Sequence, residues 1–200
     1  MRIFISPKYE IKHNNINYIY ESTLINYFKK FSNKIELINN ENFKQKLSYH
    51  KDKSVVILSG GNDLYKFNKN KVNLYRKIFE EELIKFCLKN KIKLIGICKG
   101  FQQIGDIYKF KFDKSKNHVK KNHIIFSYEK KPKKMNVNSF HNYVIKKTDK
   151  NFMDLFCSKD GSIEISINLK KSILGLMFHP ERKNIDQKKV NQLLKSYLDI

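Results

Sequence analysis

The stretch GICKGFQ, residues 96–102, decides the fold, because it places one cysteine between two glycines at the end of an apolar run. The residues KLIGI (93–97) suit a buried strand, and the residues after the cysteine can begin a helix. A G-x-C-x-G turn from a strand into a helix is typical of a nucleophile elbow, in which the glycines leave room for a strained turn. The helix N-terminus and the charge of Lys99 favour a thiolate there. Cys98 is therefore predicted to be a nucleophile, with a buried structural cysteine as the alternative on this stretch alone.

Strand and helix patterns alternate on either side of this turn in the first half of the chain. Runs of apolar residues and helically spaced apolar residues predict strands at 2–6, 34–38, 54–59 and 93–97, and helices at 17–31, 73–90 and 99–107. This alternation predicts a mostly parallel central sheet with helices on both faces. Ligands of such sheets bind at the carboxyl ends of the strands, where the turns at residues 59–61 and at Cys98 both fall.

The second half of the chain has a different texture, with short β-rich segments. Strands are predicted at 123–128, 135–139, 143–146, 162–167 and 172–178, and a last helix at about 185–198. These strands are expected to form a smaller antiparallel portion of the fold. The chain has 200 residues and no repeat or flexible linker, so residues 1–200 are predicted to form a single α/β domain.

The composition, with 40% hydrophobic and 30% charged residues, is typical of a water-soluble globular protein. No run approaches the roughly 18 apolar residues of a membrane-spanning helix. The apolar run in MRIFISPKYE is too short for a signal peptide, so we expect a cytoplasmic protein without a membrane partner. Three cysteines, Cys87, Cys98 and Cys157, without metal-ligand spacing argue against a disulfide framework and suit a reducing compartment. Cys87 and Cys157 are interpreted as packing residues.

The formal net charge of +22 raises nucleic acid as a possible partner. However, only three of the 41 basic residues are arginines, and the lysines are spread along a chain that is also rich in Asn and Ile. Those three residue types share A- and T-rich codons, which explains much of the excess. The sequence has no helix-turn-helix, zinc-finger or RNP pattern. We therefore expect no nucleic-acid partner, while a basic surface would favour an anionic substrate.

A thiolate nucleophile needs a base, and the base needs an orienting group. His179 ends the apolar run LGLMF, and Glu181 follows two residues later, so its carboxylate can reach the far edge of the imidazole. His141 also ends a predicted strand but lacks such a neighbouring acid. His118 and His123 have no supporting cysteine or acid cluster in the sequence, so no metal site is predicted.

Taken in order, these motifs resemble those of the class I glutamine amidotransferases, which have a flavodoxin-like fold, and within that superfamily the gamma-glutamyl hydrolase branch. ILSGGNDL resembles the oxyanion-hole loop, LIGICKGFQ the elbow, VNSFHN a substrate-binding segment, and GLMFHPER the His-x-Glu end of the triad. The resemblance implies Cys98 as nucleophile, His179 as general base and acid, and Glu181 as its orienting group. YRKIFEEELI resembles an Arg-Asp-x-x-Glu helix motif in which Lys77 replaces the aspartate, and this puts the salt bridge of that helix in doubt.

The resemblance also implies roles around the triad. The backbone N–H groups of Lys99 and of Gly61 or Gly60 would form the oxyanion hole that stabilises the tetrahedral intermediate. The residues implied to bind the glutamyl part of the substrate are Gln102, Asn138, Ser139, Phe140 and His141. The resemblance implies no cofactor and no metal.

The activity implied is hydrolysis of a gamma-glutamyl amide through a gamma-glutamyl thioester, with release of L-glutamate. The short chain, its Lys/Asn/Ile-rich composition and its basic balance are similar to those of hydrolases that act on CDP-L-glutamine in capsular polysaccharide biosynthesis. A small nucleotide-linked substrate is therefore expected, and no obligatory synthetase partner. Lys99 and the lysines of 109–123 are the candidate contacts for the diphosphate.

Three alternatives stay open at this point. The substrate could be another gamma-glutamyl amide. The chain could be a glutaminase subunit that delivers ammonia to a separate synthetase, because it has no room for a fused synthetase domain. It could also be a regulatory or nucleic-acid-binding relic, a reading that the intact Cys/His/Glu set disfavours.

Overall fold

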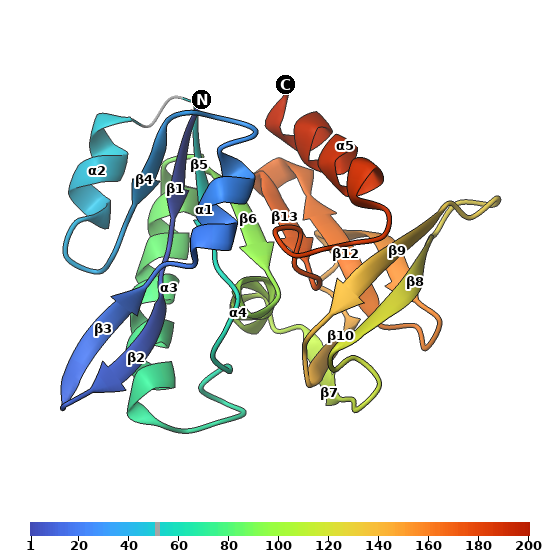
Figure 1. The fold of residues 1–200 in the computed structure, drawn as a ribbon, viewed down its shortest axis with the longest axis horizontal. Coiled ribbons are helices and arrows are strands. Elements are labelled where there is room, and N and C mark those ends of the chain that lie inside the picture. The colour runs from blue at the N-terminus through green and yellow to red at the C-terminus, as the bar shows by residue number, and fades with distance from the viewer. Residues whose placement is uncertain (51–52) are drawn as a thin grey trace.

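The computed structural model describes residues 1–50 and 53–200 and joins eleven strands into one sheet (Figure 1). These strands are β1 (Arg2–Ile5), β4 (Ile35–Leu37), β5 (Ser54–Leu58), β6 (Lys93–Ile97), β7 (Lys111–Lys114), β8 (Lys121–Ser127), β9 (Lys134–Ser139), β10 (Tyr143–Lys147), β11 (Met153–Ser158), β12 (Ile163–Asn168) and β13 (Ile173–Leu176). Their order is β4-β1-β5-β6-β13-β12-β11-β8-β9, and β10 pairs with both β12 and β7. The first five strands in this order run parallel, and the others pair antiparallel. The predicted α/β fold class is confirmed.

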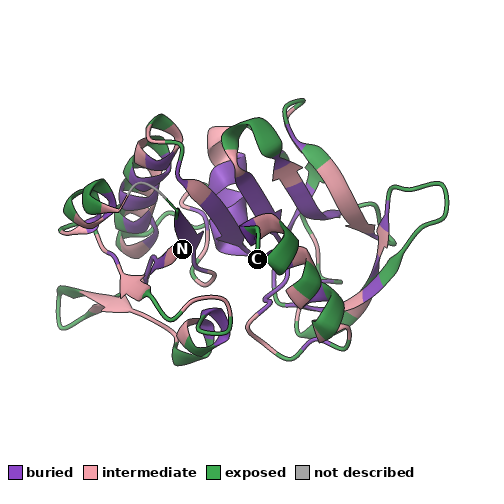
Figure 2. Cartoon of the chain, turned by 90° about the horizontal axis from the view of Figure 1, so that it is seen from above, coloured by how far each residue is buried: buried purple, intermediate pink, exposed green. Residues whose placement is uncertain are grey.

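Helices cover both faces of the parallel part of the sheet. They are α1 (Ser22–Phe28), α2 (Phe43–Tyr49), α3 (Lys71–Lys89), α4 (Lys99–Ile107) and α5 (Gln187–Leu198), with a short 3-10 turn η1 (Leu169–Lys171). Because side chains of a strand alternate between faces, Val55 and Ile57 of β5 pack with α1 and α5, whereas Val56 and Leu58 pack with α2, α3 and α4. Figure 2 shows the buried central strands enclosed between these helices. The near-continuous apolar sequence of β5 follows from this burial on both faces.

The N-terminal part of the predicted helix 17–31 is a strand instead. Residues Lys8–Lys12 (β2) and Asn15–Ile19 (β3) form a separate antiparallel hairpin, and α1 begins only at Ser22. The turn between the two strands consists of His13 and Asn14, which have φ angles of +50° and +62°. Two consecutive residues with positive φ match the right-handed twist of a hairpin, so this turn chemistry overrides the helical spacing of the apolar residues.

The other predicted elements of the first half are present within a few residues of their expected bounds. Besides the β2–β3 hairpin and η1, three elements were not predicted, namely α2, β7 and β11. β7 and β11 are irregularly paired strands, β7 with β10 and β11 with β12, and both pairings contain a register shift. A bulge disturbs the two-residue alternation by which a strand is recognised.

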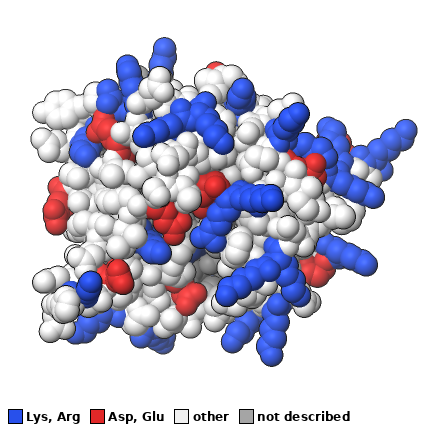
Figure 3. Space-filling view, viewed as in Figure 1, with Lys and Arg blue, Asp and Glu red and all other residues white. Residues whose placement is uncertain are grey.

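The charged side chains are distributed over the surface. Figure 3 shows lysine and arginine side chains spread across this face with acidic residues among them, not gathered into one stripe. Within residues 1–50 and 53–200, no helix combines the length and the apolar character needed to cross a membrane.

Candidate active site

The elbow predicted at residues 96–100 is present between β6 and α4. Cys98 has a φ of +49°, a backbone conformation that residues other than glycine rarely adopt. Its N–H donates to the carbonyl oxygen of Leu176 at 2.7 Å. A Cβ on Gly96 would lie 2.8 Å from the backbone nitrogen of Phe101, and one on Gly100 would overlap the carbonyl oxygen of Leu58. Both glycines are therefore required by close backbone packing, and the tight turn places the cysteine at the N-terminus of α4.

His179, which follows the end of β13, lies beside Cys98, and Glu181 lies beside His179. His179 Nδ1 is 2.6 Å from Glu181 Oε1, and the Glu181 side chain is only 2% exposed. Burial disfavours the charged imidazolium, but the neighbouring Cys98 and Glu181 outweigh burial and raise the pKa of His179 to about 10. Cys98 and His179 line the same pocket. The arrangement can hold an imidazolium between a thiolate and a carboxylate, as nucleophilic catalysis by cysteine requires.

Arg76 of α3 fixes the loop that follows β5. Its side chain is fully buried, and the guanidinium donates to the carbonyl oxygens of Ser59 (2.6 Å), Gly60 (3.0 Å) and Gly61. A Cβ on Gly60 would lie 2.5 Å from His179 Cε1, so this loop also packs directly on the imidazole. Because the carbonyls of the loop turn toward Arg76, the loop is held in one conformation at the pocket. The sequence analysis did not identify this function of Arg76.

The salt bridge that Lys77 put in doubt is present. Arg76 Nε lies 2.8 Å from Glu80 Oε1, and both side chains are completely buried. Lys77 instead pairs on the surface with Glu81, at 3.6 Å. The substitution of the family's aspartate by Lys77 therefore leaves the buried pair intact, because that pair joins positions 76 and 80.

Lys99 differs from what the sequence led us to expect. Its ammonium pairs with Glu80 inside the protein and lies 3.3 Å from Gln103 Oε1, and burial lowers its pKa to about 8 although Glu80 favours the charged form. The expectation that this charge is available to a leaving group is wrong. The backbone N–H of Lys99 lies in the first turn of α4, where N–H groups have no partner within the helix. The first hydrogen bond of this helix runs from the Gln102 N–H to the carbonyl oxygen of Cys98, at 3.0 Å.

The pocket at the elbow has a volume of about 120 Å³. It is lined by Gly61, Asn62, Asp63, Cys98, Lys99, Gln102, Phe140, His141, Asn142, Tyr143, His179 and Arg182. The structure thus brings most of the predicted site residues together. Gln102 Nε2 donates to the carbonyl oxygen of Tyr143 at 2.9 Å, which fixes that side chain at the pocket wall.

Asn138 and Ser139, predicted to bind substrate, lie behind this wall. Asn138 Nδ2 donates to the carbonyl oxygen of His179 at 2.7 Å, and Asn138 Oδ1 accepts from the His179 N–H at 2.9 Å. Ser139 is completely buried and donates to the carbonyl oxygen of His118 at 2.7 Å. Neither residue lines the pocket, so both act here by positioning neighbouring backbone.

His141 lines the pocket and has an acid beside it, contrary to the sequence-based expectation. Its Nδ1 donates to the carbonyl oxygen of Tyr143 at 3.1 Å, and burial lowers its pKa to about 4, so the ring is neutral. Its Nε2 lies 3.8 Å from Glu164 Oε1. The premise that His118 and His123 have no acid cluster is also wrong, because both lie next to Glu164. The available signal was a glutamate in the apolar strand sequence SIEISI.

The rim of the pocket carries a basic and an aromatic side chain. The ring of Phe140 is 39% exposed and lies edge-on to His179, with 5.8 Å between the ring centroids. The guanidinium of Arg182 lies 4.7 Å from the centroid of the Phe140 ring. Arg182 follows Glu181 directly, yet the sequence analysis overlooked it while attending to the lysines of 109–123, none of which lines this pocket.

Comparison with known proteins agrees with this geometry. The family model "Glutamine amidotransferase class-I" matches residues 15–194. The chain is 37% identical over 160 residues to the gamma-glutamyl-CDP-amidate hydrolase of Campylobacter jejuni, covering 74% of this chain and 78% of that protein. It is 24% identical over 173 residues to the glutamine-hydrolyzing GMP synthase subunit of Methanocaldococcus jannaschii, covering 82% and 83% of the two chains.

A solved structure of a glutamine amidotransferase from Thermotoga maritima has the same fold. Its TM-score is 0.66 at 17% identity, over 99% of this chain and 82% of that chain. The elbow, the His-x-Glu pair and the resemblance of the sequence motifs therefore have one explanation. The chain belongs to the class I glutamine amidotransferase family.

Proposed function

We propose that this protein hydrolyses a gamma-glutamyl amide, with Cys98 as its nucleophile. The Cys98 sulfur attacks the gamma-carbonyl carbon, and the backbone N–H groups of Lys99 and of Gly61 or Gly60 stabilise the oxyanion. His179, oriented by Glu181, protonates the departing nitrogen as the C–N bond breaks and the thioester forms. His179 then takes a proton from water, which attacks the thioester and releases L-glutamate and the free Cys98. The observation that supports this most is that Cys98 and His179 line one pocket, with Glu181 Oε1 2.6 Å from His179 Nδ1.

The substrate that we propose is CDP-L-glutamine, which would give cytidine diphosphoramidate for capsular polysaccharide modification. The 37% identity to the gamma-glutamyl-CDP-amidate hydrolase of Campylobacter jejuni supports this choice. The pocket at the elbow is small, with a volume of about 120 Å³. A glutamyl group would fill such a space, and the nucleotide would extend across the rim.

Arg182 is the residue best suited to contact the diphosphate at that rim. The basic residues in the pocket lining are Lys99 and Arg182, and the ammonium of Lys99 is already paired with Glu80. The Arg182 side chain is 35% exposed, and its nearest carboxylates, on Glu21 and Glu181, lie as far as 3.8 Å and 3.9 Å away. A guanidinium with free donors can bind phosphate oxygens through two parallel hydrogen bonds.

The test compares kcat/KM for CDP-L-glutamine with kcat/KM for L-glutamine and simple gamma-glutamyl amides across a salt series. We expect the nucleotide to be preferred by several orders of magnitude, and the preference to shrink as salt screens the charges. Cys98→Ala should abolish turnover of every substrate. Comparable rates for CDP-L-glutamine and free glutamine would refute the nucleotide assignment, and an active Cys98→Ala enzyme would refute the mechanism.

Arg182 can be tested separately with a matched control. Arg182→Ala should raise KM for CDP-L-glutamine at least about tenfold, which corresponds to the roughly 1.4 kcal/mol of one charged contact. Lys183→Ala removes the same charge from an exposed neighbour that does not line the pocket, and should change KM little. Equal effects of the two substitutions on KM would show that Arg182 acts only through the net positive charge of the protein and not through a direct contact with the diphosphate.

A second candidate is a glutaminase subunit that passes ammonia to a separate synthetase. The match to the GMP synthase subunit of Methanocaldococcus jannaschii over 82% of this chain favours it. In this case L-glutamine would be the substrate, and added synthetase would stimulate ammonia release. We rank it second, because the identity to that protein is 24% against 37% for the hydrolase.

A further inference from the structure

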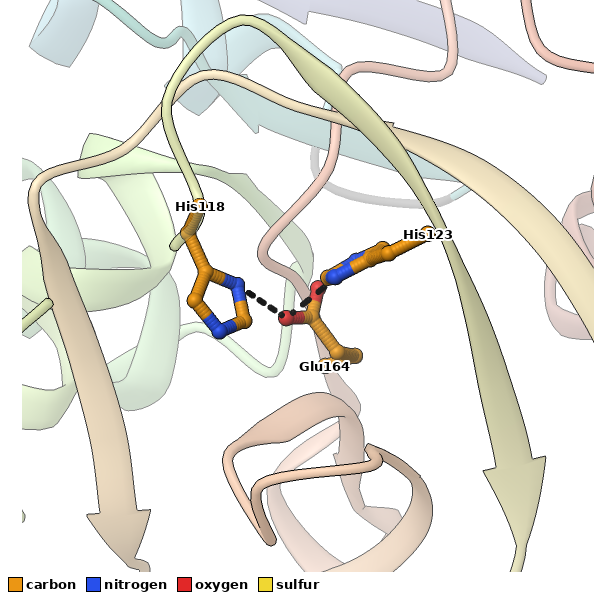
Figure 4. A group of neighbouring side chains, drawn as sticks. All are labelled: His118, His123 and Glu164. Atoms are coloured by element: carbon orange, nitrogen blue, oxygen red, sulfur yellow. Dashed lines mark ion pairs between the residues drawn. The ribbon is translucent and has the colours of Figure 1, made fainter. Parts of the chain in front are cut away.

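A cluster of two histidines and one glutamate lies outside the catalytic pocket. His118 precedes β8, His123 lies on β8, and Glu164 lies on β12, and both rings turn toward the carboxylate (Figure 4). One nitrogen of each ring and a carboxylate oxygen lie within 4.8 Å of one another. Glu164 is fully buried, and the His118 and His123 side chains are 3% and 17% exposed. None of the three is among the residues that line the Cys98 pocket.

The atoms that face one another in this cluster lack hydrogen bonds. Neither oxygen of Glu164 has a hydrogen-bond partner within residues 1–50 and 53–200, and the same holds for His118 Nδ1 and His123 Nε2. A buried carboxylate without a donor or a counter-ion is costly, so the site needs a positive charge. The chain therefore assembles a set of unsatisfied electron-pair donors around one small volume.

The second nitrogen of His118 indicates what kind of charge fits. His118 Nε2 lies 3.1 Å from Asp160 Oδ2, so its proton is donated to that carboxylate. In the neutral ring, Nδ1 then presents a lone pair toward Glu164 Oε1 at a distance of 3.4 Å. A lone pair facing an anion is repulsive unless a cation lies between them. A carboxylate that accepts from the outer nitrogen of a histidine is the usual outer partner of a metal-binding histidine.

Two of the three ligand separations match a tetrahedral ion, and the third, between the two histidine nitrogens, lies within 4.8 Å. Zn²⁺ binds imidazole nitrogen at about 2.0–2.1 Å and carboxylate oxygen at about 2.0–2.2 Å, which separates neighbouring ligand atoms by roughly 3.3–3.5 Å. Glu164 Oε1 lies 3.4 Å from His118 Nδ1 and 3.5 Å from His123 Nε2. We propose that His118, His123 and Glu164 bind one divalent transition-metal ion, with Zn²⁺ as the best fit, and that Asp160 orients His118 from behind.

A surface cavity borders the two histidines of the site. A cavity of about 530 Å³ is lined by His118, His123 and Asp160 together with Asn117, Ile124, Phe126, Ser158 and Lys159. Glu164 does not line this cavity and the ligand atoms are buried, so an ion would enter from the cavity past the two imidazole rings.

The ion would stabilise one wall of the active site rather than take part in the reaction. The carbonyl oxygen of His118 accepts hydrogen bonds from Ser139 Oγ (2.7 Å) and from the N–H of His141 (3.0 Å). His141 lines the catalytic pocket, and its Nε2 lies 3.8 Å from Glu164 Oε1. Fixing the ring of His118 would thus fix the segment that carries His141. This inference does not depend on the identity of the substrate.

The experiment measures Zn²⁺ binding by the chelator-treated full chain and by its Cys98→Ala form. The Cys98→Ala form removes the other plausible zinc ligand set, Cys98 with His179. We expect one equivalent of Zn²⁺ per chain in both forms, together with a rise in melting temperature that depends on the Zn²⁺ concentration. In the Cys98→Ala background, Asp160→Asn should weaken affinity about 10- to 100-fold, the usual cost of losing an outer partner. His123→Gln should weaken it more, because it removes a ligand.

His13→Gln is the matched control, because His13 is an exposed histidine in the β2–β3 turn, and it should leave binding unchanged. Absence of saturable uptake by the unaltered chain overturns the proposal, and so does uptake that His123→Gln leaves unchanged. The rival arrangement neutralises Glu164 with a protonated histidine. It would appear as no zinc uptake together with an imidazolium signal from His118 or His123 in the nitrogen-15 spectrum. Since His123 and Asp160 both reach the cavity surface, their variants should fold, and a melting curve checks this.

Discussion

Replacing Arg76 with methionine should affect both the stability and the catalysis of this enzyme. The substitution leaves a buried carboxylate at Glu80 and the carbonyls of Ser59, Gly60 and Gly61 without the guanidinium. Breaking a buried pair in this way costs about 3–5 kcal/mol. We expect the lower end, about 3 kcal/mol, because Lys99 still pairs with Glu80.

The same substitution should lower kcat, because it releases the loop that we propose supplies one oxyanion-hole N–H. Loss of one such donor costs on the order of 10²–10³ in kcat. The effect on KM should be small, since the donor acts on charge that develops only in the transition state. Lys77→Met is the control on the same helix. It removes a surface pair with Glu81, whose side chains are 33% and 31% exposed, and such a pair contributes about 0.3–0.5 kcal/mol.

Urea unfolding and steady-state kinetics would separate these outcomes. With a slope of about 2 kcal/mol/M, Arg76→Met should move the unfolding midpoint by roughly 1.5 M, and Lys77→Met by roughly 0.2 M. The reasoning is refuted if the two variants unfold at the same urea concentration. It is refuted in its catalytic part if folded Arg76→Met keeps the kcat of the unaltered enzyme.

Three further substitutions and conditions test the triad. Glu181→Gln should lower kcat less than His179→Ala does, since in the proposed mechanism Glu181 only orients the imidazole that moves the proton. The reverse order in steady-state assays would mean that the roles are misassigned. Gly60→Ala places a Cβ 2.5 Å from His179 Cε1 and should lower kcat on the order of 10²-fold by displacing the ring, with the melting temperature measured alongside; unchanged kcat contradicts the packing. The pKa of His179 rises from 6.5 to about 10, so the native state holds its proton more tightly than the unfolded state between these values. The free energy of unfolding should therefore fall as pH rises through that range, and the difference between the unaltered protein and His179→Gln in urea unfolding should shrink with it.

The parallel half of the fold was predictable because local sequence and final environment agree there. β5 and β6 are buried on both faces, β6 after its first residue, so their sequences are nearly continuously apolar and need no knowledge of their neighbours to be recognised. The region of 17–19 was not predictable in this way. Its apolar residues fit a helix, and only the pairing with β2 across His13 and Asn14 makes it a strand. The spacing of apolar residues in one segment does not indicate which strand it pairs with.

The candidate site residues likewise fall into those that local sequence indicates and those that only the fold reveals. Cys98, His179 and Glu181 could be proposed from sequence because each sits in a backbone context that the sequence itself displays, a glycine-flanked turn or a proline-fixed bend after a strand. Arg76, Asn138 and Glu164 were missed or misassigned because each acts across a long separation in the chain: Arg76 on the carbonyls of residues 59–61, Asn138 on the backbone of His179, and Glu164 on His118. Each of these three is polar and buried, and a buried polar side chain must find its partner elsewhere in the fold. A polar residue in an otherwise apolar segment is thus the sequence signal to follow, although the fold alone identifies its partner.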